Sequence, residues 1–174
     1  MCVNMIWIKF VKSLIKLLHS EISPNEIAGG IALGAMIGLT PVFTIQKIAL
    51  FMLVLILKVN IGAALFSVAV FALAGLLLDP VSHQLGYLLL AKIQPLTSLW
   101  AAMYNMPIVP FTRFYNTVVL GSFVLSLILF VPLFLLSKKL IIKYRQDYRQ
   151  HVEKWKIVKL LKLTSIYSIY DKYK

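Results

Sequence analysis

Gln46 and Lys47 are the polar side chains of this sequence best placed for chemistry, because they stand at the start of an apolar segment, residues 44–59. The pair follows Pro41, which ends the preceding apolar stretch. If the chain turns back inside a membrane at Pro41, a cation at that depth is costly, and a phosphate headgroup is its natural counterion. If the chain crosses the membrane, Lys47 reaches the surface as an anchor. The anchor is slightly favoured, and both readings stay open.

Two other sites place a capping side chain directly before a proline: Ser23-Pro24 and Asp79-Pro80. This pattern predicts the first turn of a helix, where free backbone N–H groups can bind an anion. In transporters, short helices that start inside the protein bind anionic groups in this way. An ordinary cap is the favoured alternative, and the Asp79 carboxylate would itself occupy the N–H groups. Ser23 and Asp79 thus join the pair above as candidate residues for a substrate or lipid headgroup.

The remaining reactive side chains form no catalytic or metal-binding pattern. The three histidines, His19, His83 and His151, lie in separate segments without the spacing of a metal site. Only Asp79 among the acidic residues lies between apolar segments, so no carboxylate pair is available for acid–base chemistry. Cys2 is the single cysteine, which rules out an internal disulfide. We therefore expect no enzymatic activity, no metal and no cofactor.

The composition indicates an integral membrane protein. The chain has 174 residues, 60% of them hydrophobic, and a mean hydropathy of +0.87, more apolar surface than a soluble domain of this size can bury. The formal net charge is +12, and eleven of the eighteen basic residues lie from Lys138 onward. Three more lie near the start, so the positive-inside rule places both termini in the cytoplasm. Nucleic-acid binding by the basic tail is a weaker alternative, and nucleic acid is not expected as a partner.

The elements that must position these residues are helices throughout. We expect an all-α, polytopic integral membrane protein with a Gly- and Pro-rich helical hairpin and amphipathic terminal helices. Its predicted parts are an amphipathic interfacial helix (1–22), a membrane domain (23–142) and a cytoplasmic basic tail (143–174). Within the membrane domain, the apolar segments predict helices over about 24–40, 44–59, 61–78, 80–94 and 117–137. Residues 96–116 are predicted as an interfacial loop rich in aromatic side chains.

The first two of these helices are expected to form a hairpin that turns at Pro41, and Pro80 is expected to be a second turn or hinge. Gly30, Gly34 and Gly38 recur every four residues and form a smooth stripe on which another helix can pack closely. Close packing is favoured, and an interface that slides or dimerises is the alternative. The helix before Pro41 is roughly 24 Å long, shorter than a hydrocarbon core of about 30 Å. Spanning and re-entrant hairpins both keep the termini on one side, so the sequence leaves both open.

A longer motif in this region reads Ser23-Pro24-x-x-Ile27-Ala28-x-Gly30-x-Ala32-x-Gly34-x-x-x-Gly38-x-x-Pro41, followed by Gln46 and Asn60. This motif resembles that of a bacterial family of membrane proteins, the domain of unknown function 2062. Asp79-Pro80 stands where the family often has a polar residue and a proline. The segment 116–122, NTVVLGS, resembles a subfamily from bacteria with outer membranes, whose gene tends to pair with that of a large, periplasm-spanning, lipid-handling AsmA-like protein. The resemblance covers about residues 20–140.

This resemblance implies a location in the bacterial inner membrane, but the family has no established activity. Our leading hypothesis is a non-enzymatic component of lipid or anionic-substrate movement, either a small translocator or the inner-membrane partner of a periplasmic lipid-handling protein. It rests on the two capped short helices, Lys47, the glycine stripe and the family setting. The alternative is a membrane scaffold or assembly factor without a substrate. The expected partners are membrane lipids, an AsmA-like periplasmic protein and a further copy of the chain.

Overall fold

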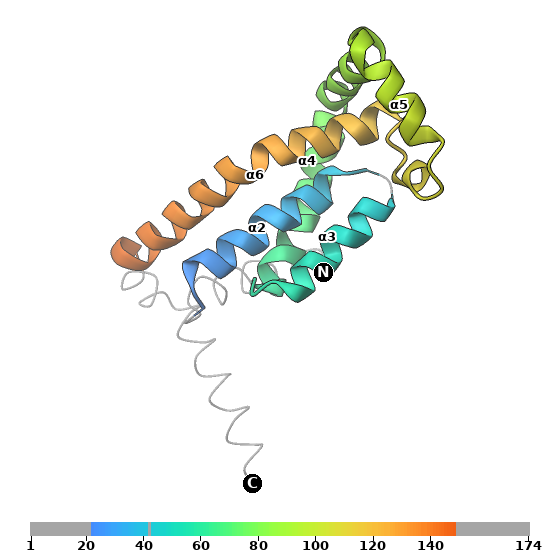
Figure 1. Cartoon of the computed structure of the whole chain (residues 1–174). Helices are drawn as coiled ribbons and strands as arrows, with labels where there is room; N and C mark the ends of the chain where they lie inside the picture. The colour runs from blue at the N-terminus through green and yellow to red at the C-terminus, as the bar shows by residue number, and fades with distance from the viewer. Residues whose placement is uncertain (1–21, 42, 149–174) are drawn as a thin grey trace, which may run out of the picture. The chain divides into compact units, whose positions relative to one another are not determined.

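The computed structural model describes residues 22–41 and 43–148, and nearly all of them are helical (Figure 1). This confirms the all-α fold class. The chain divides into two compact units, and the packing described below is that of the unit Ile22–Lys138. The predicted interfacial helix 1–22, apart from Ile22, and the basic tail beyond residue 148 lie outside the described residues.

Helix α2 (Pro24–Leu39) begins where its capping pattern predicts. The Ser23 hydroxyl accepts a hydrogen bond from the Asn25 N–H at 3.3 Å, and proline suits the first helical position because no N–H partner is needed there. The helix ends before Thr40, which has an extended conformation with ψ 115°, as the following Pro41 favours. Local sequence therefore sets both ends of α2.

Helix α3 (Ile45–Ile56) returns beside α2 and is shorter than the predicted helix over 44–59. Figure 1 shows α2 and α3 joined at one end by a short connection. We call this connection the hairpin turn, and its described residues are Thr40, Pro41, Phe43 and Thr44. At the opposite end, the Asn60 N–H donates to the Glu26 carbonyl oxygen at 2.9 Å, which ties the chain after α3 to the first turn of α2. The hairpin turn thus forms one end of the α2–α3 hairpin, and the hydrogen bond between Asn60 and Glu26 closes the other.

Helix α4 (Ile61–Tyr87) runs without a break through Pro80 and continues into the π-helical turn η1 (Leu88–Lys92). The sequence predicts two helices here, 61–78 and 80–94, with a capped start at Asp79-Pro80. That prediction is wrong, because Pro80 lies inside a continuous helix and the Asp79 side chain caps nothing. Pro80 is therefore not a turn between two helices.

Packing on both sides of Pro80 explains why the helix continues. A proline removes one N–H donor from a helix, and the helix tolerates this loss where neighbouring helices support it. Before Pro80, Gly75 is buried against the end of α2. After it, Gly86 is buried against the start of α6. Tertiary packing thus overrules the local preference for a helix start.

The predicted loop 96–116 contains short helices. These are η2 (Gln94–Leu96), α5 (Thr97–Tyr104) and η3 (Val109–Thr112). The last long helix, α6 (Thr117–Lys143), extends beyond the predicted 117–137 and is followed by the π-helical turn η4 (Tyr144–Tyr148). The Asn116 side-chain oxygen caps the start of α6, where it accepts hydrogen bonds from two backbone N–H groups at 3.0 and 3.1 Å.

Two helical stretches are long and apolar enough to cross a membrane: Ile61–Lys92, with 32 residues, and Thr117–Gln146, with 30. Helices α2 and α3, with 16 and 12 residues, are shorter than the roughly 20 residues that a crossing needs. Many large apolar side chains of α3 are nevertheless exposed, among them Ile48, Met52, Leu55 and Ile56. A membrane location would account for so much exposed apolar surface.

The glycine stripe of α2 lies directly against α4. A Cβ atom added to Gly30 would lie 2.5 Å from the Asn60 carbonyl oxygen, and one added to Gly34 would meet the Ala64 carbonyl oxygen. One added to Gly38 would lie 2.7 Å from another carbonyl oxygen of α4. None of the three positions has room for a side chain. Because the contacts advance in the same direction along both helices, α2 and α4 run parallel.

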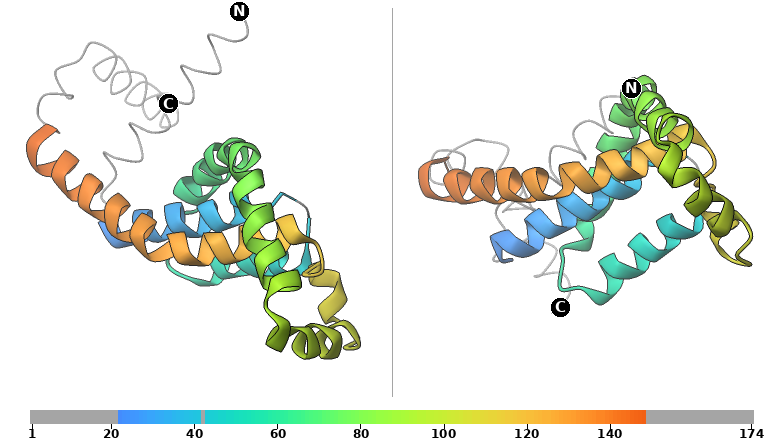
Figure 2. Two further views of the ribbon diagram at one scale, coloured as in Figure 1. Left: turned by 90° about the horizontal axis from the view of Figure 1, so that it is seen from above. Right: turned by 45° about the horizontal axis from the view of Figure 1, so that its top comes forward.

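A second close approach joins α4 to α6. A Cβ atom added to Gly86 would meet the Thr117 carbonyl oxygen, and one added to Gly121 would meet that of Ser82. These contacts advance in opposite directions, so α6 runs antiparallel to α4. The two views of Figure 2 show the first part of α6 beside α2. There, Phe123 of α6 packs against the apolar cluster that α2, α3 and α4 share.

Gly34→Ala should destabilise the protein, because the added methyl group meets the Ala64 carbonyl oxygen and one of the two helices must move. We expect the free energy of unfolding to fall by about 1–3 kcal/mol, the usual range for overpacking. Gly75→Ala is the matched control, since its Cβ would lie 3.4 Å from the Leu39 carbonyl oxygen, an ordinary contact. Thermal unfolding of both variants in detergent measures the difference. Equal stability of the two would contradict the packing role of the stripe.

Candidate functional site

Lys47 lies in the first turn of α3 and reaches back across the hairpin turn. Its Nζ donates a hydrogen bond to the Thr40 carbonyl oxygen at 2.7 Å. Thr40 follows the last residue of α2, where carbonyl groups lack helical partners and the helix dipole favours a cation. Lys47 thus links the start of α3 to the end of α2. The hydrogen bond uses one of three ammonium protons, so the charge can still act on a ligand.

Three polar oxygen atoms, two at the start of α3 and one in α4, are buried and have no hydrogen-bond partner in the described part of the chain: Thr44 Oγ1, Gln46 Oε1 and Asp79 Oδ1. Thr44 occupies the N-cap position of α3, yet its side chain makes no capping hydrogen bond. A buried polar group without a partner costs about 1–3 kcal/mol. Such groups often indicate where a ligand, an ion or water binds. Gln46 and Asp79 therefore remain candidates for ligand contact.

The contacts between α2 and α4 place the hairpin turn part-way along α4. A Cβ atom added to Gly75 would lie 3.4 Å from the carbonyl oxygen of Leu39, the last residue of α2. From Gly75 the helical chain continues to Lys92, about 25 Å further if it were straight. The hairpin therefore ends before α4 does.

The four residues predicted as a substrate site do not all come together. Gln46 and Lys47 are neighbours at the start of α3. Asp79 lies one helical turn beyond Gly75, which packs on the end of α2 nearest to them. Ser23 caps the opposite end of α2, roughly 24 Å away, and its hydroxyl serves the helix start. Ser23 is thus a structural cap that is remote from the other three.

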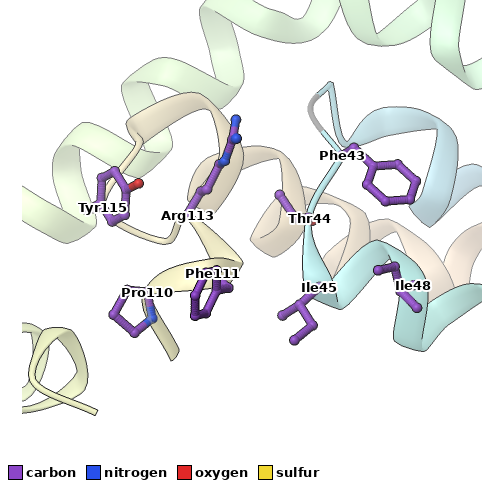
Figure 3. Close-up of a pocket in the computed structure, with 8 residues that line it drawn as sticks. All are labelled: Phe43, Thr44, Ile45, Ile48, Pro110, Phe111, Arg113 and Tyr115. Carbon is purple, nitrogen blue, oxygen red and sulfur yellow. The ribbon is translucent and has the colours of Figure 1, made fainter. Parts of the chain in front are cut away.

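A cavity of about 430 Å³ lies between the hairpin turn and the segment 110–115. Its lining residues are Phe43, Thr44, Ile45, Ile48, Pro110, Phe111, Arg113 and Tyr115 (Figure 3). The volume falls in the range of about 300–1,000 Å³ that is typical of small-molecule sites. In Figure 3 the Arg113 side chain extends between Tyr115 on one side and Thr44 and Phe43 on the other. The cavity therefore combines apolar walls with one cation.

Arg113 has a strained backbone. Its φ of 56° and ψ of 32° are left-handed, and it is the only residue other than glycine with positive φ in the described ranges. This conformation costs an ordinary residue roughly 1–2 kcal/mol. Hydrogen bonds hold it: the Arg113 N–H donates to the Pro110 carbonyl oxygen at 2.9 Å, and the Asn116 N–H donates to that of Arg113 at 3.0 Å. Strain of this kind is common at functional sites.

Aromatic packing supports the segment that carries Arg113. Phe114 is buried, with its ring centroid 5.7 Å from that of Trp100 and 6.0 Å from that of Tyr115. The Trp100 Nε1–H also donates to the Leu89 carbonyl oxygen at 3.0 Å. These aromatic residues belong to the segment predicted as an interfacial loop, and Arg113 is not among the predicted site residues. The available signal is that Arg113 is the sole basic residue between Lys92 and Lys138.

The fold and the site define an all-helical protein with two helices suited to crossing a membrane and a short glycine-packed hairpin. Within residues 22–41 and 43–148, no group of three His, Cys, Asp or Glu side chains could hold a metal ion. The model of a bacterial family described as "Uncharacterized protein conserved in bacteria (DUF2062)" matches residues 9–150. The chain belongs to this family, as its motif predicts.

A relative from Treponema pallidum (strain Nichols), described as an uncharacterized protein, is 29% identical over 140 residues. The match covers 79% of this chain and 85% of the relative. No solved structure matches the chain. The predicted pairing with an AsmA-like protein stays a prediction, because these matches do not bear on it.

Lys47→Met should loosen the hairpin turn, because it removes a charged hydrogen bond at the end of α2 and keeps a side chain of similar length. We expect the hairpin to lose about 1–2 kcal/mol of local stability. Amide hydrogen exchange in residues 45–50 should then be about 5–30-fold faster. Lys58→Met is the control, since Lys58 is exposed beyond the other end of α3. Unchanged exchange in Lys47→Met would show that the hydrogen bond does not hold the turn.

Proposed function

We propose that this protein is a non-enzymatic component of lipid or anionic-substrate movement in the bacterial inner membrane, with both termini in the cytoplasm. The observation that carries the proposal is the polar hairpin turn, which ends part-way along a helix of membrane-spanning length. Lys47 and Gln46 begin α3 there, next to Thr44 with its unpartnered hydroxyl. In the proposed topology the hairpin turns inside the membrane, while α4 and α6 cross it.

A polar hairpin turn below the membrane surface would lower the barrier to headgroup movement. A charged headgroup in hydrocarbon has a high free energy unless polar groups replace its water. Lys47 would supply positive charge, and the unpartnered oxygen atoms of Thr44 and Gln46 would hold water or headgroup donors. The exposed apolar side chains of α3 would leave the acyl chains in contact with the bilayer. The headgroup could then move beside the protein without full dehydration.

Two features support the alternative, a membrane scaffold without a substrate. The glycine stripe is fully occupied by packing between α2 and α4. Lys47 is also engaged by the Thr40 carbonyl oxygen. A partner such as a periplasmic AsmA-like protein, or a second copy of the chain, is compatible with either function and rests on the family resemblance.

Lipid movement can be tested in vesicles that contain the purified protein and a fluorescent phospholipid. We expect the wild type to expose inner-leaflet lipid to an impermeant quencher, and Gln46→Met to slow this several-fold. Gln46→Met removes a buried oxygen without a partner, so the variant should be at least as stable as the wild type. Lys58→Gln, at the exposed far end of α3, is the control and should move lipid normally.

The outcomes separate the two functions. Folded wild-type protein that moves no lipid, alone or with its partner, would contradict the translocator and leave the scaffold. A Gln46→Met variant that moves lipid at the wild-type rate would show that the polar hairpin turn is not the path.

A further inference from the structure

We infer that the cavity between the hairpin turn and residues 110–115 binds the phosphate of a glycerophospholipid headgroup through Arg113 and Thr44. This inference rests on the proposed function for its membrane setting, and it assigns the binding site and the class of ligand. Neither side chain is among the residues that the sequence predicts for a site.

The charges and donors of the cavity match a phosphate. Arg113 is its one charged lining residue, and no acidic side chain lines it. In the described part of the chain, no carboxylate pairs with Arg113. A guanidinium group presents a planar fork of N–H donors that binds phosphate oxygens in pairs. The Arg113 side chain is therefore free for an anion.

Thr44 lines the cavity together with Arg113 and carries a buried hydroxyl group. The residue is 3% exposed, and its hydroxyl has no hydrogen-bond partner within residues 22–41 and 43–148. A rotation of the Thr44 side chain toward the cavity would let this hydroxyl donate one hydrogen bond to a phosphate oxygen. Lys47, one helical turn after Thr44, adds positive charge to the same end of the hairpin. Two residues with hydrogen-bond donors, from distant parts of the sequence, thus line one cavity.

The apolar surface next to these donors indicates a lipid and not a free anion. Phe43 and Phe111, on opposite sides of the cavity, are 74% and 68% exposed. From the cavity, an exposed apolar stripe continues along one face of α3 with helical spacing; it consists of Ile45, Ile48, Met52 and Leu55. Acyl chains could lie along this stripe while the phosphate stays at Arg113. A free phosphate ion has no apolar part that could contact this stripe.

The backbone at Arg113 supports a role for its side chain. Glycine adopts the left-handed conformation without strain, whereas arginine does not. The structure therefore holds an arginine where glycine would fit better. Arg113→Gly removes the guanidinium group and relieves the backbone, which separates ligand binding from folding.

The test measures lipid binding by native mass spectrometry on the detergent-solubilised full chain. We expect one phosphatidylglycerol molecule to bind the wild type, and Arg113→Gln to weaken binding about tenfold or more. Arg113→Gly should lose binding to the same degree while its thermal midpoint does not fall. Lys92→Gln, which removes an exposed cation outside the cavity, should bind as the wild type does. Thr44→Val should weaken binding by a smaller factor.

Three outcomes would overturn the inference. The first is unchanged phosphatidylglycerol binding in both Arg113 variants. The second is equal weakening in Lys92→Gln, which would indicate general attraction to positive charge. The third is displacement of the lipid by inorganic phosphate at the same concentration, which would assign the cavity to a free anion. Binding does not require movement, so a protein that binds the lipid but moves none would keep this inference and contradict the proposed function.

Discussion

The close approach of α2 to α4 is the constraint on which the rest of this structure depends. At Gly30, Gly34 and Gly38 the backbone of α2 lies against the backbone of α4, with no room for a Cβ atom. Dispersion contacts between two helices in a membrane are strongest when small residues let the backbones approach in this way. The contact fixes the register of the two helices. It therefore decides where along α4 the hairpin turn lies, and with it the position of Lys47.

The surroundings of the polar residues near the turn depend on this position of the turn along α4. Lys47 closes the turn through the Thr40 carbonyl oxygen, and the oxygen atoms of Gln46 and Thr44 are left buried without partners. The segment 110–115 completes the cavity beside Thr44 and brings a strained arginine to it. Natural proteins keep unpartnered polar groups and backbone strain mainly where function needs them. Thr44 and Arg113 bring one feature of each kind to the same cavity, which is why we propose ligand binding there.

Features that depend on neighbouring residues were predictable from the sequence. The start of α2 at its Ser23 cap and its end before Pro41 need only local hydrogen bonds and proline sterics. Features that depend on distant segments were not. Helix α4 continues through Pro80 because α2 packs on it before Pro80 and α6 packs on it after Pro80. Capping rules consider only neighbouring residues and therefore miss these contacts. Arg113 and Thr44 line one cavity only because the chain folds back after α5, so periodicity could not pair them. The close packing of α4 and α6 at Gly86 and Gly121 was not predicted for the same reason.

The depth of the hairpin turn tests this account most directly. Phe43 is 74% exposed on the turn, so a cysteine there is open to its surroundings. In a Cys2→Ser background, Phe43→Cys can be compared with Lys92→Cys beyond the far end of α4 and Lys58→Cys at the open end of the hairpin, using a maleimide that does not cross membranes. We predict that Lys92→Cys reacts from the periplasmic side and Lys58→Cys from the cytoplasmic side. Phe43→Cys should not react from the periplasm. Periplasmic labelling of Phe43→Cys as fast as that of Lys92→Cys would show that the hairpin crosses the membrane, and would contradict the account.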